Sequence, residues 1–298
     1  MSVIRTVTGR HNPSLKLARK LQKKKYRAER GYFLAEGWDV VAAAVDAGAL
    51  PAELLVREDL AGRLPVGLRA AAERDQLDVV ICPADVLAEA SLLGGAADVV
   101  AVFPSRPGSL GDWEVGRGLT VYLHGVGDPG NVGTLVRAAA AFGAGGVGCS
   151  PGTADPFGPR ALRAGMGAQF LIPIAVEVEP EHLEAHVTGR VSRGEPAPLL
   201  LVADSRGGTD SWDVAVAVEK GCIGERGAGG GGADWGGGVI LALGSERGAL
   251  PHFAGRTLRV RIPQMRFDSL NVAMAGSILL YELRRGAAPH CAWGSPRL

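Results

Sequence analysis

The chain has 298 residues, of which 47% are apolar but only 5% aromatic, a composition that suits two domains with aliphatic cores. No uninterrupted apolar run reaches the ~18 residues of a membrane span, and the first residues lack the apolar region of a secretion signal, so we expect a cytoplasmic protein. The net charge is +1, but residues 1–30 carry ten Lys or Arg against Glu29, a net +9, so the remainder carries −8.

The first predicted element is a basic helix. Asn12 and Pro13 are typical of a helix start, and the leucines and alanine within residues 15–21 supply an apolar face. Cations on such a structured element favour contact with a polyanion. The alternative is a solvated basic helix without a ligand, and charge alone does not decide between the two.

Strands and helices alternate through the rest of the amino-terminal half. The predicted strands cover residues 32–35, 53–56, 77–82 and 98–103, and the predicted helices cover residues 38–47, 60–73 and 84–93. These elements indicate a small α/β domain over residues 1–104. Proline, glycine and serine within residues 104–109 interrupt the pattern, so we expect a linker over residues 105–117.

A second alternation predicts another α/β domain over residues 118–298. Its predicted strands are 119–124, 146–149, 171–176, 199–203, 239–243 and 257–262, and its predicted helices are 131–142, 160–166, 179–186 and 270–285. The near-continuous apolar character of the first strand is typical of a mainly parallel sheet. The glycine-rich residues 224–238 lack the strand, helix and Lys-Ser/Thr of a phosphate loop, so we interpret them as a flexible insertion.

Cysteine and histidine spacing predicts neither a metal site nor a disulfide framework. The four cysteines are scattered without a CxxC pair. His182 and His186 lie four residues apart, but no HExxH pattern accompanies them, so a solvated helix face is the better interpretation.

Polar residues follow three of the apolar runs in the carboxyl-terminal half, where an open α/β sheet builds a small-molecule site. Asn131 lies at the start of a predicted helix as a candidate N-cap, and Arg137 follows within two turns among alanines. Gly244 begins the second loop, and Asn271 ends the third. Taken alone, the first segment is better explained by a capping asparagine and an ordinary surface arginine.

Together, the three segments resemble the ordered motifs of the SpoU (TrmH) family of RNA ribose 2′-O-methyltransferases, part of the SPOUT class. The matching stretches are residues 131–137, 244–248 and 262–272. The amino-terminal half is similar to the ribosomal-protein-like RNA-binding domain of many members, through residues 12–16, the basic run and residues 31–37. The chain departs from the family's sequence pattern at Arg247 and over residues 264–268. Both departures bear on the choice of substrate more than on the reaction.

The resemblance implies a carboxyl-terminal domain with a mainly parallel sheet and a deep trefoil knot that binds S-adenosylmethionine, without a metal. By motif position, the cofactor contacts would be Gly244, Ile262 and Leu270, with Leu243 and Ser269 beside them. The catalytic residues would be Arg137, Asn131, Glu246 and Asn271. The RNA-binding residues would be Arg10, Lys16, Lys23, Lys24, Lys25 and Arg27.

The resemblance leaves the role of Arg137 open, because a guanidinium is effectively always protonated. Either Arg137 positions an RNA phosphate that helps to take the proton of the 2′-hydroxyl, which is the hypothesis favoured here, or it is deprotonated in the closed site. The family resemblance also implies a homodimer and favours ribosomal RNA, 23S rRNA in particular, over transfer RNA. Whether the modification is housekeeping or confers antibiotic resistance stays open.

Two other classes of protein fit the sequence less well. A non-catalytic RNA-binding or assembly factor with the same scaffold would have lost at least one of the four proposed catalytic residues, and all four are present. A dinucleotide-binding enzyme would need GxGxxG directly after a strand with an acid about twenty residues on, a placement that the sequence lacks.

Overall fold

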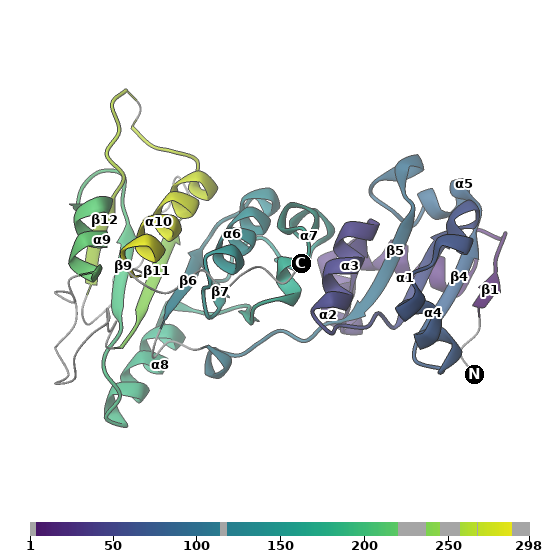
Figure 1. Ribbon diagram of the computed structural model, residues 1–298, viewed down its shortest axis with the longest axis horizontal. Helices are drawn as coiled ribbons and strands as arrows, with labels where there is room; N and C mark the ends of the chain where they lie inside the picture. The colour runs from purple at the N-terminus through teal and green to yellow at the C-terminus, as the bar shows by residue number, and fades with distance from the viewer. Residues whose placement is uncertain (1–3, 114–117, 220–236, 245–256, 267, 288–298) are drawn as a thin grey trace. The chain divides into compact units, whose positions relative to one another are not determined.

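A computed structural model describes residues 4–113, 118–219, 237–244, 257–266 and 268–287 (Figure 1). By packing, the chain forms two compact units, Met1–Pro107 with Ala154–Leu171, and Gly108–Thr153 with Ile172–Leu298. The sequence-based division differs in one respect. Residues 154–171 fall inside the predicted domain 118–298, but they pack with the first unit.

The first unit is built on a five-stranded sheet in the order β1-β4-β3-β5-β2. Strands β1, β4 and β3 run parallel, whereas β5 runs antiparallel to both β3 and β2. The strands span Ile4–Thr6 (β1), Tyr32–Glu36 (β2), Glu53–Arg57 (β3), Asp78–Cys82 (β4) and Val99–Pro104 (β5). The sequence predicts all of them except β1.

Helices cover both faces of this sheet, because side chains along a strand point alternately to either face. In β3, Leu54 and Val56 join a core with α3 and α4, and Leu55 joins a second core with α1 and α5. The helices are α1 (Pro13–Leu21), α2 (Lys24–Arg30), α3 (Trp38–Asp46), α4 (Val66–Glu73) and α5 (Ala84–Ala88).

The predicted helix 60–73 is divided in two. A 3₁₀ helix over Glu58–Arg63 precedes α4, and Leu64 between them is extended with ψ 125°. The reason is Pro65, because a proline ring disfavours the helical conformation of the residue before it.

Residues 154–171 join the first unit through an aromatic cluster. The segment contains α7 (Pro159–Gly165) and a 3₁₀ helix, Ala168–Phe170. The ring centroids of Phe157 and Phe170 lie 5.2 and 5.7 Å from that of Phe33 on β2, and Phe170 lies 4.8 Å from Phe103 on β5. Packed aromatic rings bury large apolar areas, which accounts for the placement of this segment.

The second unit has a seven-stranded sheet in the order β10-β12-β9-β11-β6-β7-β8. Every neighbouring pair in it runs parallel, as the sequence predicts for a mainly parallel sheet. The strands span Leu119–His124 (β6), Val147–Cys149 (β7), Ile174–Ala175 (β8), Leu199–Ala203 (β9), Thr209–Asp210 (β10), Val239–Gly244 (β11) and Thr257–Arg261 (β12).

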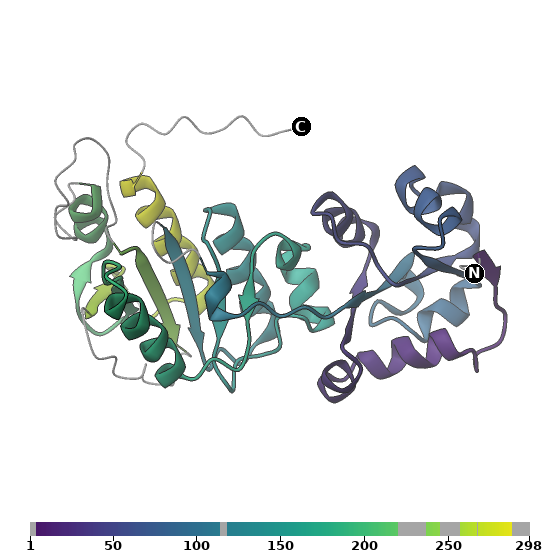
Figure 2. The same ribbon diagram turned by 90° about the horizontal axis from the view of Figure 1, so that it is seen from below.

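Helices cover both faces of the second sheet as well (Figures 1 and 2). Helix α8 packs through Leu183 on a core that includes Tyr122 and Ile240, while α10 packs with α6 and α9 on the other face. The helices span Pro129–Ala141 (α6), Pro180–Ser192 (α8), Ser211–Glu219 (α9) and Val272–Ala287 (α10). None of the helices in the described residues is long and apolar enough to cross a membrane.

Part of the predicted linker belongs to the core of the second unit. Trp113 is 4% exposed and packs with Tyr122 and Ala175. Its ring lies against the backbone of β7: a Cβ atom on Gly148 would lie 2.6 Å from Trp113, and one on Gly146 would lie 2.7 Å from it. Glycine at these two positions therefore makes room for the indole ring.

Candidate active site

The loops of all three motif segments begin at one edge of the second sheet, because the carboxyl ends of parallel strands share an edge. Gly244, the last residue of β11, is in register with His124, the last residue of β6. β12 ends at Arg261, directly before the predicted cofactor contact Ile262. The carboxyl ends of β6, β11 and β12 thus form the edge of the sheet at which the sequence predicts the site.

Two of the predicted catalytic residues meet at this edge. Asn271 Nδ2 donates a hydrogen bond of 3.1 Å to Asn131 Oδ1, across 140 residues of sequence. Asn271 Oδ1 accepts from the backbone N–H groups of Ala273, at 2.9 Å, and Met274, at 3.4 Å, so Asn271 caps the amino end of α10. The starts of α6 and α10 are therefore joined through the two asparagines.

Asn131 is not the N-cap that the sequence suggests. α6 begins at Pro129, and Asp128 is the N-cap, its Oδ1 accepting from the Asn131 N–H at 2.9 Å. Asn131 lies in the first turn instead. Because Asp128 does the capping, the Asn131 side chain is available for Asn271.

Arg137 does not join the asparagine pair within one chain. It is exposed on α6 and forms no hydrogen bond or ion pair with any residue that the structure describes. It lies six positions after Asn131 on the helix, which places it about 9 Å along the axis and roughly 120° around it. Its guanidinium is presented to solvent rather than to the asparagines.

The predicted cofactor contacts differ in exposure. Ile262 and Leu270 are half-buried and Ser269 is exposed, as suits residues that border a ligand. Leu243 is 1% exposed, and a Cβ atom on Gly276 of α10 would lie 2.7 Å from it, so its side chain belongs to the core. The predicted catalytic residue Glu246 lies outside the described residues.

Two buried polar atoms near this edge have no hydrogen-bond partner within the described part of the chain. They are Nδ1 of His124, at the end of β6, and Oε1 of Gln264, in the loop after β12. Burial lowers the pKa of the His124 imidazole below its ordinary value and so favours the neutral ring. Buried polar atoms need partners, and a polar ligand bound at this edge, such as the S-adenosylmethionine that the resemblance implies, would supply them.

Neither His124 nor Gln264 is predicted as a site residue from the sequence. Gln264 lies in residues 264–268, where the chain departs from the family's sequence pattern, and that departure is the one feature of the sequence that distinguishes it. His124 carries no signal in sequence beyond its position at the end of a strand. Among the described residues, no group of three His, Cys, Asp or Glu could hold a metal ion.

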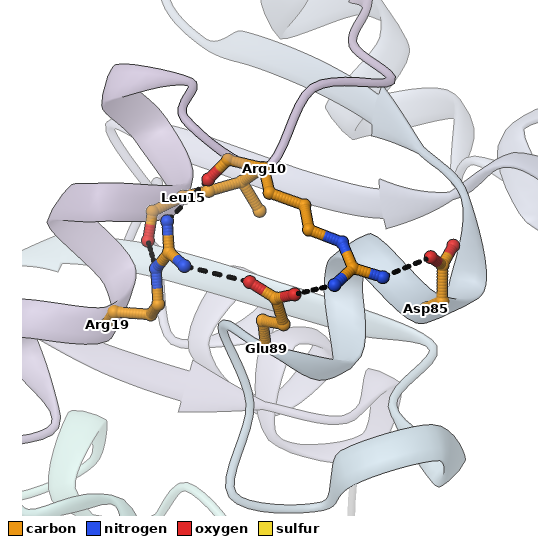
Figure 3. A network of polar contacts seen from close by, with 5 residues as sticks. All are labelled: Arg10, Leu15, Arg19, Asp85 and Glu89. Carbon is orange, nitrogen blue, oxygen red and sulfur yellow. Dashed lines mark hydrogen bonds and ion pairs between the residues drawn. The ribbon is translucent and has the colours of Figure 1, made fainter.

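Of the predicted RNA-binding residues in the first unit, Arg10 forms ion pairs with two carboxylates on the surface. Its guanidinium lies 3.1 Å from Asp85 and 3.1 Å from Glu89, and Arg19 joins the same network at 2.8 Å from Glu89 (Figure 3). The network ties the start of α1 to α5. The Arg10 and Asp85 side chains are 60% and 65% exposed, so these carboxylates weaken the attraction of Arg10 for a phosphate without removing it.

Arg27 has a structural role in place of the predicted RNA contact. It is 8% exposed, and its Nε and Nη2 donate to Asp155 Oδ2 at 2.9 and 2.7 Å. Nη1 donates to the carbonyls of Leu21 and Gln22 at 2.8 and 2.9 Å, at the end of α1. The guanidinium is therefore enclosed by partners from within the first unit.

The four predicted lysines, by contrast, are on the surface. Lys16, Lys23, Lys24 and Lys25 are all exposed, and Lys25 lies 3.8 Å from Glu29 one turn away. An exposed pair of that length contributes little and is readily exchanged for a phosphate.

Two family models match the chain, one for each half. The model of the SpoU rRNA Methylase family matches residues 118–281, and that of the MRM3-like substrate binding domain matches residues 12–101. The first match includes both asparagines and the whole seven-stranded sheet.

Similar proteins span nearly the whole chain. It is 28% identical to rRNA methyltransferase 3, mitochondrial, of Mus musculus, over 87% of this chain and 69% of that protein. It is 26% identical to the 23S rRNA (guanosine(2553)-2′-O)-methyltransferase RlmP of Bacillus subtilis, over 94% of this chain and 100% of that protein. The crystal structure of an AdoMet-bound rRNA methyltransferase from Sinorhizobium meliloti superposes with a TM-score of 0.72 and 28% identity, over 94% of this chain and 97% of the other.

Proposed function

Because the chain belongs to the SpoU rRNA methylase family, it is an S-adenosylmethionine-dependent RNA 2′-O-methyltransferase, and we propose that its substrate is 23S ribosomal RNA. The hydrogen bond between Asn131 and Asn271 carries the proposal for the site, since it joins two motif segments 140 residues apart. The match of residues 12–101 to a substrate-binding domain supports the first unit as the part that holds the RNA.

When bound, S-adenosylmethionine supplies the methyl group from its sulfonium. The joined asparagines fix the starts of α6 and α10 and orient amide donors toward the reacting ribose. Arg137 binds an RNA phosphate through bidentate hydrogen bonds from its guanidinium, and that phosphate accepts the proton of the 2′-hydroxyl. A C–O bond forms as the C–S bond breaks, and Arg137 stays protonated throughout.

A homodimer is part of the same proposal. α10 exposes Met274, Ile278 and Tyr281, spaced four and three residues apart on one face, with 57%, 37% and 47% of each residue accessible. Such an apolar stripe on a helix is typical of an interface. Pairing of two copies through α6 and α10 would bring Arg137 of one copy to the asparagines of the other. The trefoil knot stays a prediction, since residues 245–256 lie outside the described part of the chain.

The test replaces Arg137 with alanine. We expect Arg137→Ala to lower 2′-O-methylation of 23S rRNA by at least on the order of 100-fold, because the positioned phosphate is lost. Affinity for S-adenosylmethionine, measured by calorimetry, should stay as in the unchanged protein. Arg74→Ala removes an exposed arginine of the first unit and serves as the matched control. Near-normal turnover of Arg137→Ala would remove Arg137 from the mechanism.

The same calorimetry separates the enzyme from a non-catalytic RNA-binding factor. An enzyme binds S-adenosylmethionine before RNA is added, whereas a scaffold that has lost the cofactor gives no heat. Absence of binding in the unchanged protein would therefore favour the assembly factor.

A further inference from the structure

Helix α7 presents two arginines that the structure leaves without an ionic partner. Arg160 and Arg163 are exposed, and neither forms an ion pair or hydrogen bond with a described residue. Residues three apart on a helix are neighbours on its surface, so the two guanidinium groups share one face. The opposite face is apolar, since Ala161 and Leu162 are 0% and 1% exposed.

The carboxylate of this segment is already used inside the first unit. Asp155 is the sole acid of residues 154–171, and its Oδ2 accepts both hydrogen bonds from the buried Arg27. The side chains of the pair are 9% and 15% exposed, so water screens it weakly. Asp155 is therefore unavailable to neutralise Arg160 or Arg163, whose charges face solvent.

The same ion pair places the start of α7 beside the basic helix α2. A Cβ atom on Gly158, two residues before Arg160, would lie 3.4 Å from Nη2 of Arg27 on α2. α2 and α7 both pack against β2, the edge strand of the first sheet. Residues 23–30 and 154–171 together contain seven Lys or Arg against Glu29 and Asp155. Arg27 and Asp155 neutralise each other as a buried pair, which leaves six exposed cations against Glu29.

We propose that α7 is a second RNA-binding element of the first unit, in which Arg160 and Arg163 bind backbone phosphates next to those bound by the exposed lysines of α2. The inference rests on the proposed function for its ligand, an RNA. It goes beyond that function because the segment lies outside residues 12–101, which match the substrate-binding domain. Arginine suits the task, since its fork binds phosphate oxygens two at a time.

The segment that carries α7 arises from the catalytic half of the sequence. The chain leaves β7 at Cys149, builds α7 within the first unit and returns to the second sheet at β8. Phosphates bound at α7 would thus be held by a segment joined at both ends to strands of the catalytic sheet. Arg27 and Asp155 hold the segment in place without touching the RNA.

The experiment compares three full-length proteins: the unchanged chain, Arg160→Gln/Arg163→Gln, and the control Arg63→Gln/Arg74→Gln. The control removes two exposed arginines from the same unit, at the end of the 3₁₀ helix and after α4. The probe is a 23S rRNA transcript, and its affinity is measured at several salt concentrations. Thermal unfolding checks that each variant is folded.

We expect the α7 variant to lose roughly 1.5 from the slope of log affinity against log salt, since each lost phosphate contact removes about 0.7–0.9. Affinity near physiological salt should fall on the order of 10-fold, and KM for RNA should rise while kcat at saturating RNA stays the same. The control should keep the original slope. S-adenosylmethionine affinity should be equal in all three proteins.

An unchanged slope in the α7 variant would overturn the inference, as would an equal loss in the control, which would indicate a general charge effect. Failure of the proposed function looks different. A protein that binds the transcript with the expected slopes but methylates none of it would contradict the enzyme assignment and leave the role of α7 standing.

Discussion

At the scale of single residues, the carboxyl of Glu53 in the first unit is buried, which disfavours its charged form. The residue is 9% exposed, and burial raises its pKa above the ordinary value of 4.5, although Ser14 and Arg5, at 3.2 Å, act in the opposite direction. The folded chain therefore holds the Glu53 proton more tightly than the unfolded chain does. Its contribution to stability is fully present below pH 4.5 and is lost as the pH rises through the folded-state pKa.

This sign gives a prediction for Glu53→Gln, which keeps the size of the side chain and removes its charge. The free energy of unfolding of the unchanged chain, relative to the variant, should decrease as the pH rises from acid to neutral. Urea unfolding of both proteins over that range measures the difference. The exposed Glu73→Gln is the control and should show no such trend. A difference that grows with pH would contradict the assignment.

Some residues of the site could be predicted from the sequence. Asn131 and Asn271 were predicted from motif wording, and the hydrogen bond between them agrees with their placement in one site. Arg27 was not distinguishable from its lysine neighbours, because its partner Asp155 is 128 residues away in sequence. The composition shows that residues 1–30 are basic, but the burial of Arg27 among them depends on packing with a distant part of the chain.

At the scale of elements, buried strands were predictable and helix ends were not. Each apolar run of the second domain became a parallel strand, whereas α6 started two residues before its predicted first residue. Helix α9 was missed altogether, because residues 214–218 form a short run of Val and Ala, and periodicity does not distinguish a helix from a strand in such a run. Its packing against α10 accounts for the helical outcome, since tertiary contacts override weak local preference.

The contact of Trp113 with β7 predicts an effect of Gly148→Ala. The added Cβ would meet the indole ring at 2.6 Å, so either the ring or the strand must move. Such overpacking costs about 1–3 kcal/mol of unfolding free energy, measured by urea unfolding with Trp fluorescence. Gly127→Ala, which meets nothing within 4 Å, should change stability by less than about 0.5 kcal/mol. Equal stability of the two variants would show that Trp113 does not constrain β7.

At the scale of the whole molecule, the proposed homodimer rests on the exposed apolar stripe of α10. Met274, Ile278 and Tyr281 lie on a helix whose other contacts, with α6 and α9, are inside the unit. Phe142, at the end of α6, meets Tyr281 edge-on with ring centroids 6.0 Å apart. The aromatic contact ties the end of α6 to the same stripe.

We expect Ile278→Asp/Tyr281→Asp to convert a dimer to a monomer, since a buried unpaired carboxylate opposes association. Light scattering after gel filtration should give half the mass of the unchanged protein, and methyl transfer should fall with it. Val66→Asp, at a residue 85% exposed in the first unit, should leave the mass unchanged. A doubly substituted chain of unchanged mass would place the interface elsewhere.

The excursion of residues 154–171 into the first unit means that the chain crosses between its two units three times, not once. A gene fusion that joined a foreign RNA-reading module to residue 108 would separate Phe157 and Phe170 from the rings of Phe33 and Phe103. The two halves of the sequence therefore cannot be exchanged independently. A swap of the first unit must also include residues 154–171.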